Sequence, residues 1–197
     1  MKYYIYGAGG HGKVVLDALK KSGMACEGFI DDNNFLSTSN FSVFSESQIK
    51  NQEIKKIHLA IGSCSDRERI SMNWDSNSFF SVYHPDASIA LDVKIGIGTF
   101  IAANSVVSPD TQIGMHCIIN HHVTLDHDSI LGNFSHLAPH SVISGGVNIG
   151  QGVLIGSGAI VLPGISISDY AVIGAGAVVT KNVGKNVKVA GNPARPL

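Results

Sequence analysis

Hydrophobic residues recur every six positions over almost half of the chain. From Ile89 to Val179, every sixth residue is Ile, Leu or Val, and the residue four places after each of them is small or β-branched. An amphipathic helix repeats at about 3.6 residues and an ordinary strand at two, so neither produces this pattern. A period of six with glycine-rich corners, such as Ile-Gly-Ile-Gly at 95–98, predicts a parallel β-helix.

The period also predicts where side chains lie. Three hexapeptides form the three faces of one coil, and successive coils stack at about 4.8 Å, the usual spacing between strands. We expect the aliphatic residue of each hexapeptide to point inward and the small residue to fit the corner. Residues eighteen apart in sequence should then lie one above the other. Such a solenoid buries a continuous core without help from helices.

The first 83 residues lack this repeat and alternate between short apolar runs and helical spacing, which predicts a small α/β unit with a parallel sheet. We expect a Rossmann-like domain at 1–83, and a β-helix domain with a short C-terminal tail at 84–197, joined at His84-Pro85. The expected strands of the first domain are 3–6, 28–30, 57–61 and 79–82, and the expected helices are 13–21 and 67–72.

A glycine-rich turn follows the first expected strand. Residues 7–12 read Gly-Ala-Gly-Gly-His-Gly, which fits the pattern G-x-G-x-x-G, and Asp31 and Asp32 follow about 20 residues later. A domain of this size has room for one mononucleotide half rather than two. We therefore expect the turn and the helix N-terminus to bind the phosphates of one nucleotide, with the acidic pair on its ribose or base. The alternative is a tight turn without a ligand.

Charge and cysteine content narrow the class of protein. The formal net charge is −1, and no basic or acidic block interrupts the chain. We therefore expect neither a nucleic-acid nor a membrane-surface partner. No apolar run reaches the ~18 residues needed to span a bilayer. Three scattered cysteines predict free thiols, and hence a cytoplasmic protein.

Five of the nine histidines fall between residues 116 and 136. His127 lies between Asp126 and Asp128, and one of these carboxylates could orient its imidazole for general-base catalysis. A solvated polar corner is the alternative. His122 and His140 are eighteen residues apart and should stack, which is a possible start of a zinc site. No third ligand follows at a metal-binding spacing, so we expect no metal.

Both halves together resemble the hexapeptide-repeat sugar acetyltransferases of the PglD/NeuD group. This group includes UDP-4-amino-sugar N-acetyltransferases of the bacillosamine pathway, GDP-perosamine N-acetyltransferases and sialic acid O-acetyltransferases. The resemblance covers essentially the whole chain. It rests on the repeat and on Tyr-Gly-Ala-Gly-Gly-His-Gly-Lys-Val-Val at 6–15, Phe-Ile-Asp-Asp at 29–32, Ala-Ile-Gly-Ser at 60–63, Asp-His-Asp at 126–128, Phe-Ser-His at 134–136 and Gly-Asn-Pro-Ala at 191–194.

The resemblance implies a left-handed β-helix and a homotrimer, with acetyl-CoA bound in grooves between neighbouring prisms. It implies that His127 is the general base and that Asp128 raises its basicity. The residues implied to bind acetyl-CoA are His136, Gly145, Ser157 and Ala175. Those implied to bind a nucleotide-linked sugar are Gly9, Gly10, His11, Asp31, Asp32 and Cys64.

The expected function is acetyl-CoA-dependent N-acetylation of the 4-amino group of a nucleotide-linked 4-amino-4,6-dideoxyhexose, in the synthesis of a glycan such as an O-antigen or capsule. One alternative is O-acetylation of sialic acid or another sugar hydroxyl. Another is a non-catalytic β-helix that binds nucleotide sugars, and a third is a zinc enzyme. The Asp126–Asp128 cluster argues against the non-catalytic protein, because a binding scaffold needs no oriented base.

Overall fold

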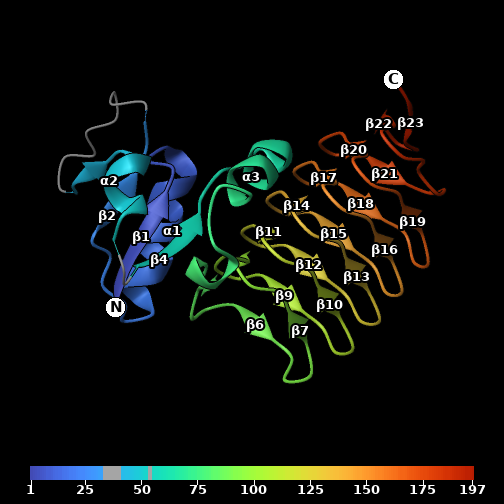
Figure 1. The fold of residues 1–197 in the computed structure, drawn as a ribbon. Coiled ribbons are helices and arrows are strands. Elements are labelled where there is room, and N and C mark those ends of the chain that lie inside the picture. The colour runs from blue at the N-terminus through green and yellow to red at the C-terminus, as the bar shows by residue number, and fades with distance from the viewer. Residues whose placement is uncertain (33–40, 53–54) are drawn as a thin grey trace.

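The computed structural model describes residues 1–32, 41–52 and 55–197. An α/β domain at the N-terminus stands beside the first coils of a three-sided β-helix, and the remaining coils lead away from it to the C-terminus (Figure 1). Hexapeptide repeats and a parallel-sheet α/β domain are thus both present, as the sequence predicts.

The α/β domain is built on a parallel sheet of order β3-β2-β1-β4. On one side of the sheet, Ile5 and Phe29 pack with Val15 and Leu19 of the first helix. Gly12 allows this close approach, because a Cβ there would overlap the carbonyl oxygen of Gly7. The elements are β1 (Lys2–Tyr6), α1 (Gly10–Lys21), β2 (Gly28–Ile30), β3 (Val43–Phe44), α2 (Glu46–Lys50), β4 (Lys55–Leu59), α3 (Cys64–Ser71) and η1 (Ser76–Ser78).

Three parallel sheets form the sides of the β-helix. Face 1 contains β5 (Val82–Tyr83), β8 (Phe100–Ile101), β11 (Ile118–Ile119), β14 (His136–Leu137), β17 (Leu154–Ile155), β20 (Val172–Ile173), β22 (Lys188–Ala190) and the antiparallel β23 (Arg195–Pro196). Face 2 contains β6 (Ser88–Ile89), β9 (Val106–Val107), β12 (Thr124–Leu125), β15 (Val142–Ile143), β18 (Ile160–Val161) and β21 (Val178–Val179). Face 3 contains β7 (Lys94–Ile95), β10 (Gln112–Ile113), β13 (Ile130–Leu131), β16 (Asn148–Ile149) and β19 (Ser166–Ile167).

Strand pairing confirms the predicted stacking of residues eighteen apart. Thr124 pairs with Val142 and Leu125 with Ile143, and the same offset recurs from coil to coil. The inward residues from Ile101 to Val179 form one buried core, as the period of six requires. We call the turns between faces corner 1/2, corner 2/3 and corner 3/1. Many corners place a residue in the left-handed region, including Asp128 at φ 56°.

The α/β domain is fixed to face 1 and corner 3/1. Phe100 and Ile118, which point outward from face 1, complete the core beneath α1. The buried guanidinium of Arg67 in α3 donates to the carbonyl oxygens of His116 (2.7 Å), Phe134 (2.6 Å) and Ile61 (2.6 Å). Since these carbonyls belong to both domains, Arg67 fixes one against the other.

One expected strand belongs elsewhere. The pattern at 79–82 predicted a fourth strand of the α/β sheet, but Val82 pairs with Phe100 as part of β5 in face 1. A parallel bridge between Phe79 and Ile57, and a hydrogen bond between the His58 ring and the carbonyl of Phe80 at 3.1 Å, join this segment to the α/β sheet. The strand was assigned wrongly because it lies just before the first clear hexapeptide. The short elements β3 and α2 were missed, and within the described residues no helix is long and apolar enough to cross a membrane.

Candidate active site

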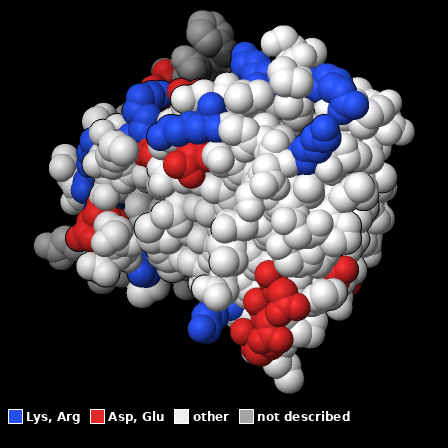
Figure 2. All heavy atoms as spheres, turned by 90° about the vertical axis from the view of Figure 1, so that its right-hand side faces the viewer, with Lys and Arg blue, Asp and Glu red and all other residues white. Residues whose placement is uncertain are grey.

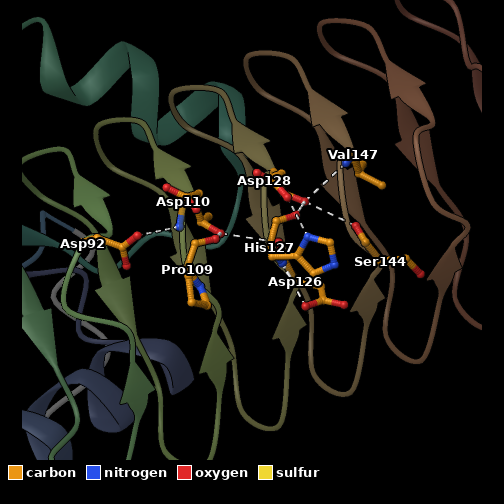
Figure 3. A network of polar contacts seen from close by, with 10 residues as sticks. Asp92, Pro109, Asp110, Asp126, His127, Asp128, Ser144 and Val147 are labelled. Carbon is orange, nitrogen blue, oxygen red and sulfur yellow. Dashed lines mark hydrogen bonds and ion pairs between the residues drawn. The ribbon is translucent and has the colours of Figure 1, made fainter.

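His127 and Asp128 form an exposed pair on corner 2/3, between β12 and β13 (Figure 3). The Nδ1 atom of His127 lies 2.7 Å from Oδ2 of Asp128, and 60% of the imidazole side chain is accessible. Asp126 instead accepts the backbone N–H of His127 at 2.8 Å. The structure therefore selects Asp128 as the carboxylate that orients the ring.

The pairing sets the protonation of the imidazole. A carboxylate only accepts hydrogen bonds, so Nδ1 carries a hydrogen and donates a hydrogen bond to Asp128. In the neutral ring, Nε2 then keeps its lone pair. The hydrogen bond to Asp128, followed by the charge of Asp126, raises the pKa of His127 above its ordinary value. His127 thus has the tautomer and the basicity of a general base.

Gly145 lies one coil above His127, directly against the ring. A Cβ at Gly145 would come within 2.6 Å of Cε1 of His127, so a side chain there would displace the imidazole. The neighbouring Gly146 N–H donates to the carbonyl of His127 at 2.9 Å and fixes the spacing. The N–H of Gly145 donates to no backbone or side-chain acceptor among the described residues. It is therefore a free donor next to the imidazole.

Ser157 and Ala175 lie on a different corner. Both are exposed on corner 1/2, and the N–H of Gly176 donates to the carbonyl of Ser157 at 2.8 Å, which confirms that they stack. Face 2 separates this corner from His127 on corner 2/3. Within one chain, Ser157 and Ala175 therefore do not lie beside His127.

His136 points outward from β14 on face 1, toward the α/β domain. Its Nδ1 donates to the carbonyl of Gly62 at 3.1 Å. Burial, with the charge of Arg67, lowers the pKa of His136 to about 4, so the ring is neutral near pH 7. In one chain it lies away from corner 2/3 and against the loop that follows β4.

The acidic pair lines a pocket of about 450 Å³ in the α/β domain, together with Tyr6, Gly7, Glu46, Ile61, Asp66, Arg69, Ile70 and Asn73. Asp31 accepts the N–H of Ala8 at 3.0 Å, and Asp32 accepts that of Glu46 at 3.0 Å. Gly7 of the glycine-rich turn and the acidic pair therefore line one cavity, whereas Gly9, Gly10 and His11 do not line it.

The other residues expected to bind the nucleotide sugar lie at the edge of this region. Gly9 caps α1, and a Cβ at Gly9 or Gly10 would meet nothing within 4 Å, so the helix N-terminus is open. His11 packs edge-on against Phe100 with ring centroids 5.2 Å apart, and burial lowers its pKa to about 3. His11 therefore has a packing role between the domains. Burial raises the pKa of Cys64, whose thiol faces the carbonyl of Val153 at 3.8 Å.

His122 and His140 stack as predicted, with ring centroids 4.7 Å apart and an angle of 5° between the planes. Among the described residues, no group of three or more histidine, cysteine or carboxylate side chains could hold a metal ion.

Comparison with known proteins identifies the family. The model of the PglD N-terminal domain matches residues 2–74, and the model of the bacterial transferase hexapeptide (six repeats) matches 92–127 and 146–181. The acetyltransferase domain of PglB from Neisseria gonorrhoeae FA1090 is 32% identical, with a TM-score of 0.93 over all of this chain and 99% of that chain. The chain belongs to the PglD family of hexapeptide-repeat acetyltransferases. It is therefore an enzyme of the acyltransferase class.

Two further structures resemble this PglD-family protein over its whole length. PerB from Caulobacter crescentus, solved with CoA and GDP-perosamine, is 29% identical with a TM-score of 0.94, and the match covers 97% of that chain. WeeI from Acinetobacter baumannii AYE is 26% identical with a TM-score of 0.89 over all of that chain. An uncharacterized protein, L142 of Acanthamoeba polyphaga mimivirus, is 32% identical over 115 residues, which are 56% of this chain and 23% of that protein.

Sequence reasoning missed the residues that connect the two domains of this PglD-family protein. Arg67 lies in the run Asp-Arg-Glu-Arg, which is typical of an exposed helix, yet its side chain is buried. Glu68 accepts a hydrogen bond from Gln151 at 2.6 Å across the same interface. No spacing or motif marks either residue, because their partners come from distant coils.

Proposed function

We propose that this protein transfers the acetyl group of acetyl-CoA to the 4-amino group of a nucleotide-linked 4-amino-4,6-dideoxyhexose, with His127 as the general base. The His127–Asp128 pair carries the proposal, because it presents an oriented, basic and accessible nitrogen. Two relatives support the substrates: PerB was solved with CoA and GDP-perosamine, and the PglB domain with acetyl coenzyme A. A cytoplasmic location belongs to the proposal, since reducing compartments keep thiols free.

In the first step, the amine attacks the thioester carbonyl of acetyl-CoA. A sugar ammonium has no lone pair, so it loses one proton to solvent before the neutral amine can attack. As the carbon–nitrogen bond forms, Nε2 of His127 accepts a second proton from that nitrogen, and Asp128 stabilises the resulting imidazolium through Nδ1.

The tetrahedral intermediate carries its negative charge on the former carbonyl oxygen. The N–H of Gly145, adjacent to the imidazole and without an acceptor among the described residues, is placed to stabilise it. A backbone donor of this kind is worth about 2.7–4 kcal/mol in the transition state. When the carbon–sulfur bond breaks, the CoA thiolate leaves and the amide product remains. His127 can return its proton to the thiolate.

The site requires more than one copy of the chain, in our proposal a homotrimer. Face 2 lies between the two corners that hold the proposed site residues, and its outward side chains are largely apolar. Val106 and Ile160 of face 2 are 41% and 38% exposed, whereas face 3 presents Gln112 and Asn148 beside an exposed Ile130. Most of the β-helix side opposite the α/β domain carries no charge (Figure 2). Packing face 2 around a threefold axis would set corner 2/3 of one copy beside corner 1/2 of the next.

The α/β domain would bind the nucleotide. In this proposal the open N-terminus of α1 takes the phosphates, and the pocket beside Asp31 and Asp32 takes the ribose or base. His136 and Cys64 lie between this domain and the β-helix, where the sugar would pass toward the transfer site.

The deciding experiment measures CoA release from acetyl-CoA with a thiol reagent. UDP-, dTDP- and GDP-linked 4-amino-4,6-dideoxyhexoses are offered in parallel with free sialic acid. We expect turnover with one nucleotide amino sugar and loss of turnover in His127→Ala. Turnover with sialic acid alone would replace the proposal with O-acetylation, and silence across the panel would contradict an acetyltransferase acting on these sugars.

A complementation test addresses the shared site. His127→Ala removes the base on corner 2/3, and Ala175→Trp obstructs corner 1/2. If each site combines the two corners from different copies, randomly mixed trimers of the two inactive variants should regain about a quarter of wild-type activity. The double variant serves as the control and should stay inactive. Absence of any recovery in co-refolded mixtures would place the whole site within one chain.

A further inference from the structure

A chain of hydrogen bonds runs from the α/β domain to a histidine that the proposed mechanism does not use. Nδ1 of His136 lies 3.1 Å from the carbonyl oxygen of Gly62, and its Nε2 lies 3.3 Å from Nδ2 of Asn120. Oδ1 of Asn120 lies 3.0 Å from Nδ1 of His121 and 2.9 Å from the backbone nitrogen of His121. Three side chains thus connect the loop after β4 to corner 1/2.

The hydrogen bond between His136 and Gly62 fixes which group donates and which accepts in the other hydrogen bonds of this series. A carbonyl oxygen only accepts, so the Nδ1 of His136 that faces Gly62 must carry a proton. Nε2 of the neutral ring then accepts from the amide of Asn120, whose oxygen is left to accept from Nδ1 of His121. His121 is therefore protonated on Nδ1 and presents the lone pair of Nε2. Burial also lowers the pKa of His121, which favours this neutral form.

The position of His121 relates it to the transfer site. It stands on corner 1/2 in the same column as Ser157 and Ala175, and His140 donates its N–H to the carbonyl of His121 at 3.0 Å. Ser157 lies two coils further along, about 10 Å away at the strand spacing. His127 belongs to the same coil as His121, six residues on. His121 is therefore level with the base rather than with the arm of the coenzyme.

We propose that His121 is a specificity residue whose Nε2 accepts a hydrogen bond from a hydroxyl of the acceptor hexose, in a site completed by His127 of a neighbouring copy. This inference rests on the proposed function. A hexose carries donors of this kind next to its amine, and a neutral imidazole nitrogen is a matching acceptor. Asn120 and His136 are positioning residues: they fix the tautomer of His121 and connect it to the loop beside the nucleotide pocket, to which Ile61 belongs.

The first test separates sugar binding from coenzyme binding. His121→Phe retains a ring but removes the acceptor, and His121→Gln returns an acceptor at a similar reach. We expect KM for the nucleotide sugar to rise about 5- to 10-fold in His121→Phe and to stay within about twofold of wild type in His121→Gln, as one lost hydrogen bond predicts. KM for acetyl-CoA should not change.

The adjacent His122 provides the matched control. It is exposed and stacks on His140, so His122→Phe should leave both KM values unchanged. An unchanged sugar KM in His121→Phe, or a rise in KM for acetyl-CoA instead, would overturn the inference while the proposed function stands. A wild-type protein that acetylates none of the amino sugars would remove the proposed function itself.

A second readout does not depend on turnover. Nitrogen-15 NMR distinguishes the two imidazole tautomers, and at pH 7.5 we expect both His121 and His136 to be protonated on Nδ1. Asn120→Leu should leave His136 anchored to Gly62 but convert His121 to a mixture of tautomers, with a partial rise in the sugar KM. A His121 protonated on Nε2 in the wild-type protein would contradict the proposed acceptor.

Discussion

His116 and His127 occupy corners of the same prism, yet their surroundings are opposite. His116, on corner 3/1, is buried, stacks on Phe134 with centroids 5.3 Å apart, and meets the edge of Phe79 at 4.5 Å. Burial, then the charge of Arg67, lowers its pKa to about 4. His127, on corner 2/3, is 60% exposed, and its pKa is raised by Asp128.

The comparison separates a scaffold corner from a reactive one. Both corners use the same six-residue backbone unit and place a residue at positive φ, His116 at 53° and Asp128 at 56°. At corner 3/1 the polar groups are taken up by α3, whose Arg67 binds the carbonyl of His116 itself. At corner 2/3 the described residues of the α/β domain give the outward nitrogen of His127 no such partner. The exposure and basicity of a corner histidine therefore depend on what covers the corner, not on the repeat.

The largest effect should come from removing the base. In His127→Ala we expect kcat to fall by about 10²- to 10⁴-fold, the usual contribution of general-base catalysis, with the fold intact. In His116→Leu, kcat should stay within about threefold, since that ring only packs. Steady-state CoA release and circular dichroism on both variants make the comparison. Equal losses of kcat would mean that the two histidines do not differ in role.

The next effect concerns the residue that covers corner 3/1. Arg67→Leu leaves the carbonyls of His116, Phe134 and Ile61 without donors, and we expect it to lower the free energy of unfolding by about 3 kcal/mol. Arg69→Leu is the control, because Arg69 is exposed and its ion pair with Asp66 is screened by solvent; it should leave the urea midpoint almost unchanged. Urea unfolding measures both. Similar midpoints would show that Arg67 does not hold the domains together.

Acidification should weaken the buried corner. The folded pKa of His116 is about 4, below the 6.5 of a free imidazole, so the unfolded chain takes up a proton first. Stability from this group is complete above pH 6.5 and is lost as the pH falls toward 4. Between pH 7.5 and 5 the loss should be about 2 kcal/mol. His58 and His136, whose pKa values are also lowered to about 4, act in the same direction.

His116→Leu checks the assignment of this pH effect. Urea midpoints at pH 7.5 and 5 should differ less in the variant than in the wild-type protein, by the share that His116 contributes. A wild-type midpoint that is constant across this range would contradict the buried, neutral state of the ring.

The smallest effect distinguishes the two aspartates of the reactive corner. Asp128→Asn removes the charge that faces Nδ1, so the pKa of His127 should fall and the acid limb of the pH–rate profile should move to lower pH. We expect activity at neutral pH to drop about tenfold, because the ring becomes a weaker base and its imidazolium loses the facing negative charge. Asp126→Asn still accepts the backbone N–H of His127 and should change activity less than twofold. Equal effects would show that Asp128 does not orient the base.

Most of the fold is predictable from the sequence because its cause is periodic. The repeat alone predicts which residues of the β-helix are buried, and the stacking of His122 on His140 follows from their offset. The element α2 was missed although Ser45 and Gln48 form a readable capping box, since so short a helix leaves no periodic pattern. The residues of strand β5 are assigned to the wrong sheet because they lie just before the first clear hexapeptide.

The candidate site likewise contains some contacts that the sequence predicts and others that it does not. His127 and Asp128 are adjacent, so their pairing is visible in the sequence, and Gly145 is reached by adding one coil. The network of Gly62, Asn120 and His136 joins residues up to 74 positions apart and has no periodic relation. Such contacts depend on how α3 is seated on face 1, which no local pattern encodes. That explains why Arg67 was not predicted.

Because the offset is always eighteen residues, positions along the axis of the β-helix are evenly spaced. Features on the same corner are separated from one another by a whole number of coils, about 4.8 Å each. Removing a complete coil C-terminal to Gly145, for example residues 154–171, would bring Ala175 closer to the level of His127 by the rise of one coil. His127 and the α/β domain would not change. In the proposed shared site, the length of thioester donor that fits could therefore change only in steps of one coil.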